Sequence, residues 1–370
     1  MHNHHALLDV FAGCGTSLVE ARMAGYDSFG IELNPLGRLL TEVKTTPLDL
    51  NLLKENKEKL TRLLESKSLE PKIPDFPNRD FWFEKNVQDQ LGRLRSGIER
   101  IHNDKVRKFF LGCFVSIIRK CSNADPLMMK PVFTKRMHNL RATGIRPNAF
   151  RLFDQKFQEY SQTIANLNFL KFDKSISTII GDDARQIKLK QKSVHLCITS
   201  PPFINAQDYF RQTKLEILWA GLATSGEIRE LARRQIGMDI SNVKNNESER
   251  LHLIGKSYSE NVDKVISRVY EKDKKRAFII YHYFTEIKKV FEETRRVLAD
   301  EGVLVITIGD GTIRNVPIKT HELMIDVIEG IGFRTKKVSY DLIKTHNLVP
   351  KRNVTAGVMN REWAEVFTKT

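Results

Sequence analysis

The chain has 370 residues, which is enough for about two domains, and its hydrophobic content of 41% is enough for a buried core. It carries 60 Lys and Arg against 45 Asp and Glu, and this net charge of +15 is typical of a protein with a polyanionic partner such as nucleic acid, with an ordinary basic surface as the alternative. The four cysteines show no C-x-x-C spacing, which argues against a disulfide framework or a zinc ribbon. The longest apolar run, Phe109–Ile118, is too short to cross a membrane, and no signal-peptide pattern is present at the N-terminus, so we expect a cytoplasmic protein with no membrane partner.

Strand and helix patterns alternate through the first part of the chain. Ala6–Gly13 is predicted to be a strand, followed by a helix from about Ser17, and Ser28–Pro35 is predicted to be a second strand. Residues 45–172 have the pattern of helices and loops and predict a mainly helical inserted subdomain.

Strands return in the second part of the chain. Ser193–Thr199 is a nearly continuous apolar strand of the kind that is buried in parallel sheets. Residues 205–275 are rich in charge and predict a second insertion. An amphipathic helix over 283–298 precedes a strand at Gly302–Asp310, and the segments 334–343 and 362–369 predict a hairpin at the edge of the sheet. The alternation predicts an α/β fold with a doubly wound, mostly parallel sheet formed by residues 1–44 and 173–370.

A glycine-containing turn follows the first predicted strand. Asp9 lies at the end of the strand and Gly13 and Gly15 lie in the turn, while Leu18 takes the place of a third glycine. An acid, Glu32, follows about 20 residues later at the end of the next strand, where a ribose diol is usually bound. The pattern favours a nucleoside cofactor over a plain strand–helix connection. Asp9 at the turn suits a cationic group better than a pyrophosphate.

Four short motifs, "DVFAGCGT", "GIELNP", "GDDAR" and "TSPPF", occur in this order along the chain. Together they resemble S-adenosylmethionine-dependent DNA amino-methyltransferases, and "SPPF" most resembles the cytosine-N4 subgroup. The resemblance implies a Rossmann-like methyltransferase sheet with an antiparallel C-terminal strand, S-adenosylmethionine as the cofactor and DNA as the substrate. In such a protein, residues 1–44 and 173–370 are the catalytic domain, and the insertion at 205–275 is a candidate target-recognition region.

The resemblance also implies roles for individual positions of this chain. Glu32 would bind the ribose hydroxyls, and either Asp182 or Asp183 would bind the adenine amino group. The residues around the methionine end of the cofactor would be Asp9, Phe11, Gly13, Gly15 and Thr16.

The residues Ser200, Pro201, Pro202 and Phe203 would form the pocket for the target base. The exocyclic amine of a base is a poor nucleophile because its lone pair is delocalised into the ring. The Ser200 hydroxyl and the Pro201 carbonyl can accept its two hydrogens and free that lone pair, while the successive prolines fix the backbone. Phe203 would stack on a base extruded from the duplex. No cysteine follows the prolines, so we expect direct displacement rather than a covalent intermediate. A strand that ends in a Pro-Pro turn beside a core phenylalanine is the structural alternative.

Candidate DNA contacts occur in two segments. The segment from Pro126 to Phe153 contains six cations and no acid, and a solvated surface is the alternative to phosphate binding. A second group follows the prolines and either contacts the DNA backbone or caps the next helix. The candidates are Lys130, Lys135, Arg136, Arg141, Arg146 and Arg151 in the first segment and Asp208, Tyr209 and Arg211 in the second. No arrangement of metal ligands is apparent, and we expect no metal.

Only five residues precede Ala6, whereas the family normally has a segment there with an aromatic–proline motif that closes over the methyl end of the cofactor. Three explanations are open: a misassigned start, a partner chain that supplies the lid, or a weakened cofactor site. Alternative functions are therefore adenine-N6 methylation of DNA, amino-methylation of RNA, and DNA binding by a catalytically weakened protein. The resemblance also implies a cognate restriction endonuclease as a partner.

Overall fold

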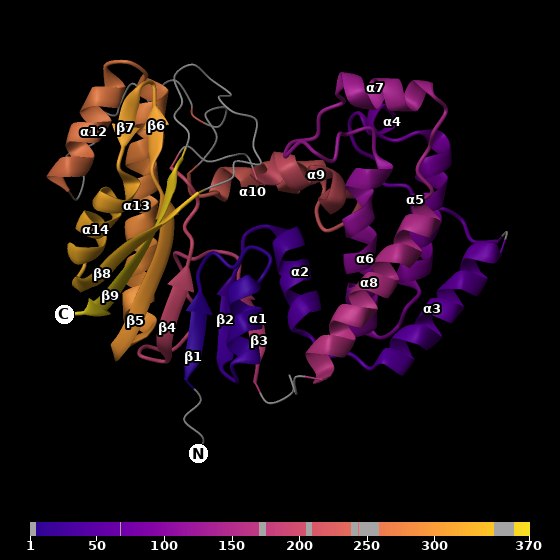
Figure 1. The fold of residues 1–370 in the computed structure, drawn as a ribbon, viewed down its shortest axis with the longest axis horizontal. Coiled ribbons are helices and arrows are strands. Elements are labelled where there is room, and N and C mark those ends of the chain that lie inside the picture. Colours follow the sequence, from indigo (N-terminus) through magenta and orange to yellow (C-terminus); the bar gives the residue numbers. More distant parts are fainter. Residues whose placement is uncertain are drawn as a thin grey trace.

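The computed structural model describes residues 5–66, 68–169, 175–204, 209–237, 243, 259–343 and 359–370. The chain forms a sheet with its flanking helices on one side and a group of helices on the other, and α9 (Tyr209–Ala220) and α10 (Ser225–Arg234) lie between the two parts (Figure 1). No described helix combines the length and the apolar character that a membrane span needs.

The sheet has seven strands in the order β3-β2-β1-β4-β5-β9-β8. The pairs among β1 to β5 are parallel, whereas β9 is antiparallel to both of its neighbours. This arrangement confirms the predicted α/β fold with a doubly wound, mostly parallel sheet and an antiparallel C-terminal strand. The strands are β1 (Ala6–Asp9), β2 (Asp27–Ile31), β3 (Ser177–Gly181), β4 (Val194–Thr199), β5 (Leu298–Gly309), β8 (Phe333–Leu342) and β9 (Arg361–Lys369).

The predicted elements differ from the observed ones mainly at their ends. The strand predicted over Gly302–Asp310 begins earlier, at Leu298, and the helix before it, α13 (Lys274–Val297), begins nine residues before the predicted start at position 283. The tail does form a hairpin, but β9 lies inside the sheet between β5 and β8, so only β8 is at the edge. Two features were not predicted: β3 and the small hairpin of β6 (Gly311–Ile313) and β7 (Val316–Ile318).

The long segment between β2 and β3 is helical, as predicted. Helix α1 (Thr16–Met23) lies before this segment, between β1 and β2. The segment contains α2 (Pro35–Thr45), α3 (Leu50–Glu65), α4 (Arg79–Trp82), α5 (Lys85–Glu99), α6 (Asp104–Cys121), α7 (Lys135–Ala142) and α8 (Ala149–Phe169). The central helix α6 is buried along most of its length, because its apolar residues recur all around the helix.

The core of these helices also includes α9, which comes from the segment predicted as a second insertion. Phe210 and Leu215 of α9 are buried in this core, and Trp219 packs against Phe83 with ring centroids 5.3 Å apart. In contrast, α12 (Glu260–Tyr270) packs on α13 beside the sheet. The two insertions therefore share a core through α9, and the domain boundaries stay a prediction.

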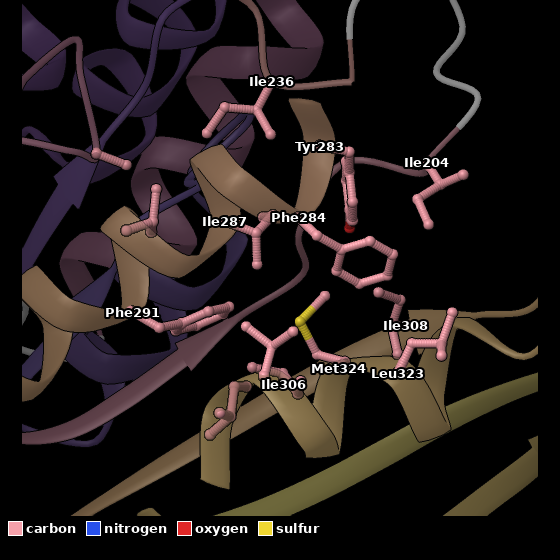
Figure 2. Packing of buried hydrophobic residues seen from close by; sticks show 14 of the residues in the cluster. Ile204, Ile236, Tyr283, Phe284, Ile287, Phe291, Ile306, Ile308, Leu323 and Met324 are labelled. Atoms are coloured by element: carbon pink, nitrogen blue, oxygen red, sulfur yellow. The ribbon is translucent and has the colours of Figure 1, made fainter. Parts of the chain in front are cut away.

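A second core lies between the sheet, α13 and α14 (Thr320–Glu329) (Figure 2). Tyr283 and Phe284 of α13 pack there with Met324 of α14 and Ile308 of β5. Ile204, which directly follows the "SPPF" motif, is buried in the same cluster. This burial anchors the end of the segment that leaves β4.

One buried carboxyl group in the sheet lacks a partner. Glu365 of β9 has no exposed surface, and neither of its carboxylate oxygens has a hydrogen-bond partner among the described residues. Burial, with a smaller contribution from the charge of Asp310, raises the pKa of Glu365 to about 8. At neutral pH the folded protein therefore keeps a proton that the unfolded chain releases.

We expect the free energy of unfolding to fall as the pH rises, because only the folded protein keeps the Glu365 proton. The native state binds one more proton than the unfolded state between about pH 5 and 8, so the free energy of unfolding should fall by about 1.4 kcal/mol per pH unit through this group. Glu365→Gln has no proton to release and should flatten the dependence by that amount. Denaturant unfolding of both proteins at several pH values measures the difference. Equal slopes would show that Glu365 is not protonated in the native state.

Candidate functional site

A cavity of about 420 Å³ lies where the parallel strands β1 to β4 reach their carboxyl ends, and its size is typical of a small-molecule site. Residues from all four sequence motifs line it, together with side chains of α9 and of the end of α10. The predicted site residues on its wall are Phe11, Gly13, Glu32, Asp182, Asp183, Ser200, Pro201, Pro202, Phe203 and Tyr209. The predicted cofactor residues Asp9, Gly15 and Thr16 are not among the lining residues.

The turn after β1 depends on two glycines. Gly13 and Gly15 have φ values of 55° and 80°, in the left-handed region that favours glycine. A Cβ atom on Gly15 would lie 2.6 Å from Cγ2 of Thr41, so α2 packs directly against this turn. Gly15 is the N-cap of α1 and holds the turn in shape, whereas Gly13 is exposed on the cavity wall.

Glu32, at the end of β2, contacts the same turn. Its two carboxylate oxygens accept hydrogen bonds from the backbone N–H groups of Gly13 and Asn34, both at 2.7 Å. Burial raises the pKa of Glu32 to about 6, although these hydrogen bonds favour the charged form. The carboxylate is therefore fixed in position at the cavity and ionised at neutral pH, ready to accept hydrogen bonds from hydroxyl groups.

Asp9 lies behind the cavity. Its Oδ1 atom accepts hydrogen bonds from the Thr199 hydroxyl at 2.7 Å and from the Phe11 backbone at 3.0 Å. Burial raises the pKa of Asp9, and only 4% of the residue is exposed. Asp9 thus links the ends of β1 and β4, and its predicted contact with the cofactor stays a prediction.

The two acids of "GDDAR" differ in their surroundings. Arg185 Nε and Nη2 donate to the two oxygens of Asp183 at 2.8 Å each, and the same Arg185 also pairs with Glu286 of α13. Asp182 instead pairs with Arg234, at the end of α10, at 3.0 Å, and its side chain is 45% exposed against 24% for Asp183. Asp183 is therefore held by the protein on both oxygens, and Asp182 is the more accessible of the two.

The motif after β4 presents one hydroxyl at the cavity. The Ser200 hydroxyl donates to the backbone carbonyl of Thr307 in β5 at 3.1 Å. This hydrogen bond uses the only proton of the hydroxyl and leaves the oxygen lone pairs as acceptors. Pro201 is buried and Phe203 is half-buried, and both line the cavity beside Ser200.

The residues after the motif have different positions. Tyr209 begins α9 and lies on the cavity wall, where burial, followed by the nearby charge of Glu32, raises its pKa. Tyr209 thus lines the cavity, and its predicted contact with DNA stays a prediction. Arg211 is exposed in the first turn of α9, and the predicted contact Asp208 lies outside the described residues.

The six cations between Pro126 and Phe153 are not all unpaired, although this segment contains no acid. Arg136 pairs with Asp125, Arg146 pairs with Glu84, and Arg141 donates to Asn123 Oδ1 at 3.0 Å. The sequence predicted no compensating carboxylates, and this is corrected for Arg136 and Arg146, whose acids come from outside the segment; the DNA contacts of the six cations stay a prediction. In the part of the chain that the structure describes, Lys130, Lys135 and Arg151 make no ion pair.

Sequence reasoning missed several residues of the cavity. Gly37 in α2 lies so close to the turn that an added Cβ would be 2.6 Å from the Gly13 carbonyl oxygen and 2.8 Å from Glu32 Cγ. Asn34 caps α2 and donates to the Thr213 hydroxyl of α9 at 3.1 Å. Asn34 and Pro35 of "GIELNP" are a helix-start signal that could have located α2 at the site. Nothing in the sequence near Arg234 indicates its position.

Across the described ranges, no group of three or more His, Cys, Asp or Glu side chains is placed to hold a metal ion.

Comparisons with known proteins agree with the motifs. The chain is 25% identical over 378 residues to Type II methyltransferase M.MvaI of Kocuria varians, covering 96% of this chain and 81% of that protein. It is 24% identical to Type II methyltransferase M.AvaI of Nostoc sp. and of Anabaena variabilis, covering 90% of this chain and 74% of those proteins. The chain is similar to Type II methyltransferases over nearly its whole length.

Two other comparisons add little. No family model matches the chain. A solved structure of a SAM-dependent methyltransferase from Methanosarcina mazei has a TM-score of 0.34 at 7% identity, covering 100% of this chain and 94% of that one, which is too distant for an inference about this site.

The close packing around Gly37 gives a first test of the cavity geometry. Gly37→Ala should lower the free energy of unfolding by roughly 1–3 kcal/mol, because the new methyl group overlaps a backbone oxygen that cannot move cheaply. Gly181→Ala is the matched control, since an added Cβ at Gly181 has no atom within 4 Å. Denaturant unfolding compares the two variants. A Gly37→Ala protein as stable as the control would contradict the packing of α2 against the turn.

Proposed function

We propose that this protein transfers a methyl group from S-adenosylmethionine to an exocyclic amine in DNA, and that the amine is cytosine N4. One observation carries the proposal: Glu32, Asp182 and the Ser200–Phe203 segment line the same cavity. The similarity to Type II methyltransferases and the net charge of +15 support the same substrate class. A paired restriction endonuclease is a further proposal, and it rests on the resemblance alone.

The cavity fits the cofactor by its size and by its acceptors. Glu32 would accept hydrogen bonds from the ribose hydroxyls, and Phe11 and Gly13 would border the methionine end. Asp182 would accept the adenine amino group in preference to Asp183, whose oxygens already bind Arg185. When bound, S-adenosylmethionine supplies an electrophilic methyl group carried on a positive sulfur, which keeps the electron pair of the broken bond.

The Ser200–Phe203 segment would prepare the amine. Because its proton is donated to Thr307, the Ser200 hydroxyl can accept one amine hydrogen, and the Pro201 carbonyl can accept the other. These two hydrogen bonds draw the nitrogen toward tetrahedral geometry and localise its lone pair for attack. As the new N–C bond forms, the nitrogen becomes positively charged, and one of its two protons then passes to solvent water. Phe203 would hold the extruded base by stacking and exclude water from its face.

The target is tested by product analysis. Purified protein is incubated with cofactor labelled in the methyl group and with unmethylated duplex DNA or RNA, and the nucleic acid is then digested to nucleosides. We expect labelled N4-methylcytosine from DNA. Labelled N6-methyladenine would correct the base, a labelled ribonucleoside would correct the nucleic acid, and an absence of label with retained DNA binding would contradict the catalytic proposal.

The proposed role of Ser200 predicts a specific kinetic effect. Ser200→Ala should lower kcat by about a hundredfold and leave the cofactor Kd unchanged, because the hydroxyl acts on the amine in the transition state. Ser193→Ala is the matched control, since Ser193 precedes the same strand at its opposite end and its hydroxyl donates to the Lys190 carbonyl. Methyl transfer rates and calorimetric titration with the cofactor measure the two quantities. An equal loss of cofactor affinity would assign Ser200 to cofactor binding instead.

A further inference from the structure

The loop from Asp125 to Thr134, between α6 and α7, exposes a group of apolar side chains. Leu127 is 78% exposed and Val132 is 40% exposed. Phe81 of the neighbouring helix α4 is 52% exposed, and its ring contacts that of Phe133 in the loop with centroids 5.8 Å apart. A single exposed leucine needs no explanation, but here several large apolar side chains are exposed in one loop and in the helix that it contacts.

The 125–134 loop is held in a fixed shape by one buried carboxylate. The Asp125 backbone N–H donates to the Val132 carbonyl at 2.8 Å, and the Asp125 side chain accepts from the Leu127 backbone at 3.0 Å and from the Thr134 hydroxyl at 2.7 Å. Arg136 donates to both oxygens of Asp125, and this interaction holds the pKa of Asp125 well below its usual range. Leu127 is thus exposed to solvent in a loop whose two ends are joined by hydrogen bonds.

The 125–134 loop is also tied to the helix that forms one wall of the cavity. Arg119 donates to the carbonyl oxygens of Met128 and Met129 in the loop, at 3.3 and 3.4 Å, and to the Gln212 carbonyl of α9. Gln212 is one turn from Tyr209, which lines the cavity. The guanidinium group of Arg119 therefore connects the loop to α9, the helix whose residue Tyr209 lines the candidate active site.

The charge around the loop selects the kind of partner. No acid occurs between Pro126 and Phe153, and Lys130 and Lys135 make no ion pair within the described ranges. Exposed apolar side chains close in sequence to cations without ion pairs suit a duplex whose phosphates flank an opened base stack.

We infer that the 125–134 loop binds the DNA duplex beside the extruded base, with Leu127 against the opened base stack and with Lys130 and Lys135 on flanking phosphates. This inference rests on the proposed function, because extrusion of a base leaves a gap in the stack that water fills poorly. An apolar side chain in that gap removes its own surface and that of the exposed bases from water.

The Leu127 contact is tested with two serine variants. Leu127→Ser should lower kcat/KM for methylation of duplex DNA by about tenfold or more, which corresponds to the loss of one buried leucine contact. Its melting temperature and cofactor Kd should stay unchanged, because the side chain is 78% exposed and lies outside the cavity. Ile176→Ser is the matched control: Ile176 is 63% exposed at the start of β3, at the opposite end of the parallel strands, and should have no effect.

The phosphate contacts are tested without relying on catalysis. Lys130→Glu and Lys135→Glu should each reduce the slope of log K against log salt for duplex binding by about one unit. Lys105→Glu is the control, because Lys105 lies in the first turn of the 18-residue helix α6, roughly 24 Å along the helix from its end at Cys121, which precedes the loop. Fluorescence anisotropy with a labelled duplex gives the slope.

The outcomes separate this inference from the proposed function. An inactive wild-type protein would contradict the function, whereas the salt slopes would still support or contradict the loop as a duplex contact. Normal methylation by Leu127→Ser together with unchanged slopes would overturn the inference and assign the surface to a different partner. A loss of methylation accompanied by a lower melting temperature or weaker cofactor binding would also overturn it, because Leu127 would then be a structural residue.

Discussion

The hydrogen bond from the Thr199 hydroxyl to Asp9, 2.7 Å long and buried, joins the ends of the paired strands β1 and β4. The Phe11 backbone N–H contacts both groups, so the turn after β1 and the residue before Ser200 are fixed to each other. A carboxylate at this depth is costly to bury, as its raised pKa shows, and hydrogen bonds from Thr199, Ser17 and the Phe11 backbone offset part of that cost. This link fixes the start of the glycine turn relative to the residue before Ser200.

The helical part of the protein completes the site from the other side. Helix α9 buries one face in the helical core through Phe210 and Trp219 and presents Tyr209 and Thr213 to the cavity. Arg119 of α6 then connects α9 to the 125–134 loop. The cavity wall and the proposed DNA surface are therefore parts of one packed unit, and in our proposal the helical insertion would align a duplex with the Ser200–Phe203 segment.

The sequence predicted most of the sheet because β1, β2, β4 and β5 are apolar runs that end in clear turn signals. β3 was missed because its five residues are only partly buried and give little periodic signal. The cavity residues within motifs were found, but Arg234 and Gly37 come near the site only through the packing of α10 and α2. The charge pattern misled for a similar reason: Asp125 and Glu84 lie outside the basic segment in sequence and contact it in space.

The most direct test is a crystal structure of the protein grown with S-adenosylhomocysteine, the demethylated form of the cofactor. We expect the ribose of the ligand to contact Glu32, its adenine amino group to contact Asp182 and its sulfur to point toward Ser200 and Pro201. Density for the ligand on any other surface, or with its sulfur directed away from the Ser200–Phe203 segment, would contradict the claim that one cavity holds both the donor and the acceptor of the methyl group.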